Sequence, residues 1–252
     1  MEKWLIAGFW GLVSGSALVL GSLAGYYLKI SQKAVAIIMG FGAGVLISAL
    51  SFELMDEAFK TGGFQSTAIG FISGAGIYSL ANYLLSTRGA RHRKRSEGQQ
   101  PSETEQSGSG TAIALGALLD GIPEAIAIGI SMIQGGAVSA ATVIAIFISN
   151  IPEGLSSSAG MKNAGRSKLF IFGIWSAIAV LTSIAAVLGY TVFSDLSPEV
   201  NAATIAIAAG AILTMLADTM MPEAFEKGHN LIGMVTVVGF LCAFMLSKMA
   251  GM

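Results

Sequence analysis

Asp120-Gly-Ile-Pro-Glu124 and Asn150-Ile-Pro-Glu153-Gly154 carry the same Ile-Pro-Glu sequence at two places in the chain. Each lies near the middle of an apolar stretch long enough to cross a lipid bilayer, residues 111–133 and 137–159. A carboxylate at that depth costs about 3 kcal/mol or more unless a cation or a polar group neutralises it. Neither stretch contains a basic residue, so the acids need a partner, and a bound metal cation is the simplest one.

Helical spacing brings the polar groups of each stretch onto one face. Asp120 and Glu124 are four residues apart, as are Ser149 and Glu153, and Asn150 lies three residues before Glu153. Residues three and four apart are neighbours on a helix surface. Each stretch therefore predicts a cluster of oxygen donors at the depth of the bilayer centre.

A proline stands one residue before each glutamate. Pro123 and Pro152 have no backbone N–H, so they leave the carbonyls of Leu119 and Ile148 without their usual helical donor and favour a bend. In a membrane such a carbonyl is tolerated only where protein buries it or where it lines a polar cavity. The two prolines thus predict bent helices around an ion site.

The composition is that of a membrane protein that crosses the bilayer several times. Hydrophobic residues make up 54 % of the chain and charged residues 12 %, with a mean hydropathy of +0.72, whereas soluble domains average about a quarter charged residues. The net charge of -1, with basic residues spread over short loops, argues against nucleic-acid binding. A single cysteine, Cys242, excludes an internal disulfide.

Eight apolar runs predict an all-α fold of eight transmembrane helices. They cover residues 4–28, 34–55, 66–85, 111–133, 137–159, 169–192, 202–222 and 231–248. The hydrophilic segment 87–110 is too polar to bury a core and is predicted to be a disordered loop. It divides one membrane domain into helices 1–3, residues 1–86, and helices 4–8, residues 111–252.

Basic residues predict the orientation. Eleven lie on the side of segment 87–110 and three on the other side. The eleven are Lys29, Lys33, Arg88, Arg91, Arg93, Lys94, Arg95, Lys162, Arg166, Lys168 and Lys227, and the three are Lys3, Lys60 and Lys248. Because positively charged loops stay in the cytoplasm, we expect a cell-membrane protein with both termini outside and segment 87–110 inside, where its basic cluster meets anionic lipid headgroups.

Internal similarity predicts inverted repeats. Five residues of the second helix align without gaps with five of the seventh: Gly44, Leu50, Glu57, Ala58 and Phe59 with Gly210, Leu216, Glu223, Ala224 and Phe225. With eight spans these helices run in opposite directions, as do the fourth and fifth. We therefore expect helices 1–3 to repeat as 6–8 and helix 4 as 5, a pattern of secondary transporters.

At these residues the chain resembles the ZIP (Zrt/Irt-like) family of divalent metal transporters. The resemblance rests on Ile122-Pro123-Glu124, Asn150-Ile-Pro-Glu153-Gly154, Glu53-Leu-Met-Asp-Glu57-Ala58 and Met221-Pro222-Glu223-Ala224, and extends over all the predicted helices. It implies transport towards the cytoplasm, with a moving part that contains the fourth and fifth helices.

Three positions depart from the ZIP pattern. Asp120 and Ser149 stand where the family commonly has histidine, and Gly121 stands for its asparagine. The two histidines, His92 and His229, lie outside the predicted helix cores. Imidazole suits zinc, whereas oxygen donors suit manganese and other hard ions and tolerate ferrous iron. The sequence therefore leaves the ion open among zinc, manganese, iron, cobalt and cadmium.

Seven residues are candidate metal ligands. The central ones are Asp120, Glu124, Ser149, Asn150 and Glu153; Glu53 and Asp218 stand near the ends of the second and seventh helices. The alternatives are protonated carboxyls bonded to backbone, a serine bonded back to its own helix, and interfacial acids at positions 53 and 218.

The predicted function is metal transport by alternating access, with no organic cofactor, in a lipid bilayer, and with a homodimer left open. One alternative keeps the fold but uses the acids as a structural ion site or proton relay. An intramembrane metal-dependent hydrolase is disfavoured, because no His-Glu-x-x-His motif or serine–histidine pair is present at membrane depth. We therefore expect a transporter and not an enzyme.

Overall fold

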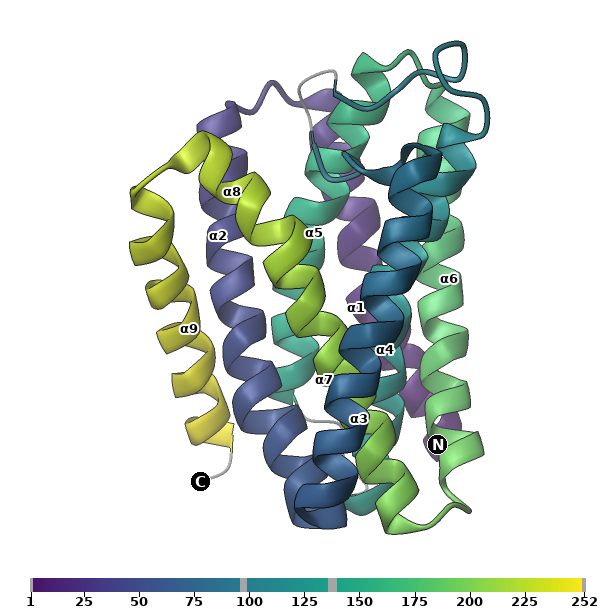
Figure 1. Cartoon of the computed structure of the whole chain (residues 1–252), viewed down its shortest axis with the longest axis vertical. Helices are drawn as coiled ribbons and strands as arrows, with labels where there is room; N and C mark the ends of the chain where they lie inside the picture. Colours follow the sequence, from purple (N-terminus) through teal and green to yellow (C-terminus); the bar gives the residue numbers. More distant parts are fainter. Residues whose placement is uncertain (1, 96–98, 136–139, 251–252) are drawn as a thin grey trace.

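The computed structural model describes residues 2–95, 99–135 and 140–250, and their regular structure is helical throughout, with no strand. The long helices stand side by side as an elongated bundle (Figure 1). In chain order the elements are α1 (Lys3–Tyr27), α2 (Gln32–Ala49), the π-helical η1 (Leu50–Leu54), α3 (Met55–Leu85), η2 (Ser86–Ala90), α4 (Ser109–Gly135), α5 (Ala140–Asn163), α6 (Lys168–Phe193), α7 (Pro198–Met215), η3 (Leu216–Met220), α8 (Met221–Gly228) and α9 (Leu231–Ala250).

Six helical segments in the described part of the chain are long and apolar enough to cross a membrane. One of them, Gln32–Ala90, is 59 residues long and turns back at Gly63, whose φ of 69° lies in the left-handed region that glycine adopts without strain. The more polar α5 lies inside the bundle. The prediction of an all-helical, multi-pass membrane protein is confirmed. The count of eight spans stays a prediction. The first residues of the predicted fifth span, 137–159, lie outside the described residues.

The start of α1 and the end of α9 lie at the opposite end of the bundle from segment 87–110 (Figure 1). The start of α1 and the end of α9 lie at the lower end in Figure 1, and the chain between α3 and α4 lies at the upper end. This arrangement agrees with the alternation on which the charge count depends. The side of the membrane that each end faces stays a prediction.

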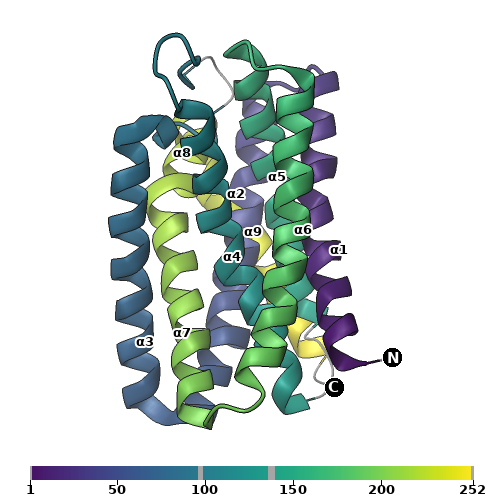
Figure 2. The same cartoon turned by 90° about the vertical axis from the view of Figure 1, so that its right-hand side faces the viewer.

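Glycines let neighbouring helices touch through their backbones. A Cβ added to Gly21 of α1 would overlap the carbonyl of Ile151 in α5, and one added to Gly154 would overlap the carbonyl of Leu18. Small residues at helix crossings permit this close approach in lipid. Comparable contacts join α1 to α6, α4 to α6, α3 to α7 and α2 to α9 through Gly15, Gly129, Gly74 and Gly239, and Figure 2 shows α3 lying beside α7.

The second and seventh helices share one further feature. Both α2 and α7 contain 18 residues, and each is followed by a five-residue π-helical segment, η1 or η3. The first residues of these π-helical segments, Leu50 and Leu216, are a pair that the sequence alignment had matched. This coincidence supports the inverted repeat, which remains a prediction.

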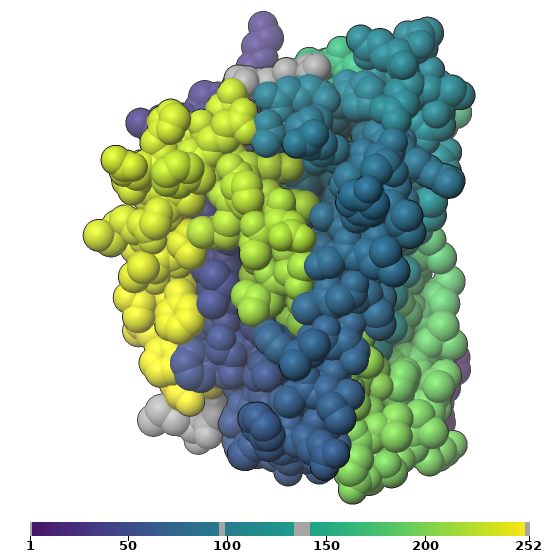
Figure 3. All heavy atoms as spheres, viewed as in Figure 1, coloured from purple at the N-terminus to yellow at the C-terminus, as the bar shows by residue number. Residues whose placement is uncertain are grey.

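Apolar side chains cover the outside. The face drawn in Figure 3 is formed mainly by α3, α7, α8 and α9, and the exposed side chains of α3 and α9 include Ile69, Ile72, Leu80, Val237 and Leu241. In a soluble protein such a surface would aggregate. In a bilayer it faces lipid tails, so the polar groups inside the bundle become the informative ones.

Candidate functional site

The two Ile-Pro-Glu stretches place their acids inside the bundle. Asp120 and Glu124 of α4 are each 3 % exposed, and Glu153 of α5 is 7 % exposed. Pro123 and Pro152 lie within continuous helices, one residue before the glutamates. The geometry expected from helical spacing is therefore present in both helices.

Asp120 is held by a guanidinium and a phenol. Arg93 donates from Nε to Oδ2 at 3.1 Å and from Nη2 to Oδ1 at 3.0 Å, and the hydroxyl of Tyr78 donates to Oδ1 at 2.6 Å. Arg93 also donates to the hydroxyl of Tyr78 and to the side-chain oxygen of Asn82. This paired arrangement of two N–H donors on one carboxylate is the strongest geometry that arginine offers.

Lys94 joins the acids of the two helices. Its Nζ lies 3.2 Å from Oδ2 of Asp120 and 3.1 Å from Oε2 of Glu153, and its side chain is 1 % exposed. Burial alone would lower the pKa of this amine, but the carboxylates of Asp120 and Glu153 outweigh burial and raise it. Lys94 is therefore a buried ammonium group at the position between α4 and α5 where a metal ion was expected.

The segment that carries Arg93 and Lys94 is packed against the bundle. The side-chain amide of Gln100 donates to the carbonyls of Arg93, Arg95 and Ser157, and the hydroxyl of Ser156 donates to the carbonyl of Lys94. The structure describes residues 87–95 and 99–110 of this segment, and 96–98 lie outside the described residues, so its disorder stays a prediction. Placing the whole basic cluster at lipid headgroups was wrong for Arg93 and Lys94, because buried carboxylates attract them more strongly.

The remaining predicted ligands divide into two groups. Ser149 and Asn150 are buried beside Glu153; Ser149 donates to the carbonyl of Ile146 at 2.9 Å, and the amide nitrogen of Asn150 donates to the carbonyl of Ser14 at 3.0 Å. The oxygen of Asn150 is not used in that bond. Ser149 follows the alternative of bonding back to its own helix.

Glu53 and Asp218 are not brought to the same place. Glu53 lines a surface hollow with Asp56, Glu57 and Lys60, and the exposed Asp218 lines a separate groove whose other residues include Arg91. Among the described residues, no three His, Cys, Asp or Glu side chains form a ready metal site. The structure thus gathers five of the seven candidates around one interior region.

Comparisons with known proteins give two relatives over most of the chain, while no family model matches it. The chain is 24 % identical over 259 residues to "Zinc transporter ZupT" of Clostridium perfringens, covering 91 % of this chain and 90 % of that protein. It is 25 % identical over 223 residues to "Putative zinc transporter At3g08650" of Arabidopsis thaliana, covering 86 % of this chain but only 34 % of that longer protein. Both are ZIP family names. The chain is therefore similar over most of its length to proteins with ZIP family names.

The interior of the bundle contains more acidic than basic side chains. Glu124 is influenced electrostatically by Glu153 and Asp120, and Glu223 by Asp120. The buried cations among these four acids are Arg93 and Lys94. Fully ionised, the four carboxylates would exceed the two cations by two negative charges. One divalent cation, or two protons, would restore neutrality.

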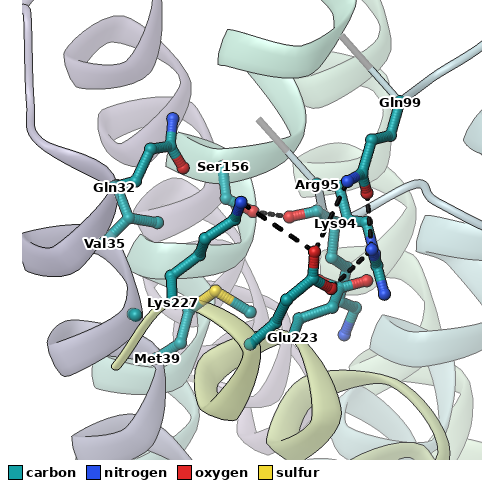
Figure 4. Close-up of a pocket in the computed structure, with 11 residues that line it drawn as sticks. Gln32, Val35, Met39, Lys94, Arg95, Gln99, Ser156, Glu223 and Lys227 are labelled. Carbon is teal, nitrogen blue, oxygen red and sulfur yellow. Dashed lines mark hydrogen bonds and ion pairs between the residues drawn. The ribbon is translucent and has the colours of Figure 1, made fainter. Parts of the chain in front are cut away.

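A small pocket adjoins this interior. It has a volume of about 30 Å³ and lies between α2, α5, α8 and the segment after η2, as Figure 4 shows. Its lining includes Lys94, Ser156, Glu223 and Glu226. Oε2 of Glu223 is buried without a hydrogen-bond partner. The pocket has room for a water molecule or a dehydrated ion beside an acid that lacks a donor.

Proposed function

We propose that this protein transports a divalent metal cation across a membrane and that Glu124 and Glu153 bind the cation during transit. The observation that carries the proposal is Lys94, an ammonium group held at 3.1 Å from Glu153 between two acid-bearing helices. A group of carboxylates that stabilises a buried ammonium group can also stabilise a metal cation in its place. The two relatives named as zinc transporters make a metal ion the natural substrate.

The ligands available to the metal are oxygen atoms. Glu124 and Glu153 offer carboxylates, and Asn150 offers its side-chain carbonyl, while Asp120 is engaged by Arg93. Oxygen donors of this kind suit manganese and accept zinc and ferrous iron. We place zinc first because of the names of the relatives, and manganese and iron next because the site lacks imidazole.

The proposed route follows the predicted orientation. The cation enters from the side of the chain termini, and the carboxylates of Glu124 and Glu153 replace part of its water shell. It then leaves through the pocket lined by Glu223, at the end of the bundle where segment 87–110 lies. Alternating access, with α4 and α5 in the moving part, gives release into the cytoplasm. The cell membrane is the proposed location, with segment 87–110 on the cytoplasmic side.

A second candidate function is favoured by one observation. Arg93 and Lys94 already neutralise Asp120 and Glu153, so the same fold could use the acids as a permanent structural network that conducts no metal. The two candidates differ in measurable flux. A structural network predicts no metal movement at any metal concentration.

Flux into proteoliposomes tests the proposal. Purified protein is reconstituted, and uptake of zinc, manganese, iron, cobalt and cadmium is followed with an ion-sensitive dye inside the vesicles. We expect uptake of at least one ion by the wild type and loss of that uptake in Glu124→Ala and Glu153→Ala. Asp195→Asn, a change at an exposed acid outside the bundle, is the matched control and should transport normally. Equal flux in the double glutamate variant and the wild type would refute the site.

A further inference from the structure

Arg93 and Lys94 are adjacent in sequence but are held in different ways. Arg93 makes two hydrogen bonds to Asp120 and further ones to Tyr78 and Asn82. Lys94 lies 3.2 Å from Asp120 and 3.1 Å from Glu153, but it shares its charge between these two carboxylates and makes no paired contact like that of Arg93. The guanidinium is thus fixed by geometry, whereas the ammonium group is held mainly by charge.

Lys94 also has an alternative position beside it. Its side chain lines the pocket that contains Glu223 and Glu226, and Glu223 acts on it electrostatically. Figure 4 shows that Lys94, from the segment after η2, and Glu223, from α8, both line this pocket. A lysine side chain has four rotatable bonds, so its ammonium group can move several ångströms without any shift of the backbone.

We propose that Lys94 is an internal competitor of the transported metal: its ammonium group and a metal cation occupy Glu153 alternately, and metal binding moves the ammonium group into the pocket beside Glu223. Arg93 stays on Asp120 and keeps the segment in place. This inference rests on the proposed function, because it assigns regulation to the same site. It makes the metal affinity of the resting protein lower than the affinity of the bare carboxylates.

Metal binding to charge-altered variants tests the competition. The half-saturating concentrations of Zn²⁺ and Mn²⁺ are measured in detergent for the wild type, Lys94→Gln, Lys94→Arg and Lys33→Gln. Lys94→Gln removes the competing charge, so we expect its half-saturating concentration to fall at least about ten-fold, which corresponds to about 1.4 kcal/mol. Lys94→Arg keeps the charge and should stay near the wild type, as should Lys33→Gln, a change at an exposed lysine.

Chemical labelling of the wild type tests the movement without any substitution. Acetic anhydride is added with and without saturating Zn²⁺, and the acetylation of Lys94 and Lys33 is quantified by mass spectrometry. We expect Lys94 to be protected without metal and to react at least about ten-fold faster with metal, because a displaced amine enters the pocket; Lys33 should not change. Labelling stays interpretable even if Lys94→Gln fails to fold.

The outcomes separate this inference from the proposed function. If metal is bound and transported while Lys94→Gln binds it with unchanged affinity and Lys94 stays protected at saturation, the competition is refuted and the transport proposal survives. If neither the wild type nor Lys94→Gln binds or transports any tested ion, both are refuted.

Discussion

Replacing Asp120 by asparagine removes the carboxylate that Arg93 and Lys94 share. Both cations are almost fully buried, with side chains 3 % and 1 % exposed, so each would lose a charge partner in a region that water does not reach. Removing one partner of a buried ion pair costs about 3–5 kcal/mol. Because asparagine still accepts one hydrogen bond from Arg93, we expect the lower end, about 3 kcal/mol.

The exposed pair Lys60–Asp56 supplies the matched control. Its 2.6 Å ion pair is shorter than any contact of Asp120 with a cation, but the side chains are 71 % and 48 % exposed, and an exposed pair of this kind contributes little to stability. If burial rather than distance sets the energy, Asp120→Asn should lower the melting temperature in detergent by about 6–12 °C and Asp56→Asn by about 1–2 °C.

The melting temperatures can be read from the intrinsic fluorescence of the tryptophans during heating. The double variant Asp120→Asn with Arg93→Met should recover part of the loss, since it removes the uncompensated guanidinium as well. Equal falls in melting temperature for Asp120→Asn and Asp56→Asn would refute the reasoning from buried charge. So would a double variant whose melting temperature falls by the full sum of the two single changes.

Two further predictions concern packing and pH. Gly74→Ala should destabilise the protein by about 1–3 kcal/mol, because the added Cβ would overlap the carbonyl of Ile207. Gly76 lies on the same helix with open space around it, so Gly76→Ala should be neutral or stabilising. Unfolding of both variants in denaturant compares their stability. Arg166 and the backbone N–H of Gly108 hold the pKa of Glu103 below its usual 4.5, so the stability that this contact gives is complete above pH about 4.5 and is lost as the pH falls through the lowered pKa. Hydrogen exchange at Gly108 should therefore accelerate, relative to its intrinsic rate, on acidification in the wild type, and Glu103→Gln should remove that pH dependence.

The sequence predicted the helices and the positions of the acids well, for a physical reason. Apolar runs of bilayer length can satisfy their backbone hydrogen bonds in lipid only as helices or closed barrels, and a helix fixes which residues share a face. Asp120 and Glu124 therefore had to lie together once α4 was helical. The burial of Glu153 followed in the same way from its position in the middle of α5.

The partners of those acids were not predictable in the same way. Arg93 and Lys94 stand among Arg88, Arg91 and Arg95 in a polar segment, and nothing in their local pattern marks them as the buried members. The available signal was the imbalance of charge in the two Ile-Pro-Glu stretches, which contain acids but no basic residue. Buried acids of this kind require cations from another part of the chain or from a bound ion. A metal and a lysine satisfy that requirement equally, and only the three-dimensional packing distinguishes them.

The glycine contacts sort the helices into three sets. Backbone-to-backbone contact ties α1, α4, α5 and α6 to one another, and it separately ties α3 to α7 and α2 to α9. Surfaces fitted so closely tolerate little internal sliding, so each tied set tends to shift as a rigid body. Asp120 and Glu153 belong to the first set, whereas Arg93 and Lys94 follow directly from the end of α3. These buried ion pairs therefore fasten two rigid bodies together, and any displacement of one body past the other has to unfasten or stretch them.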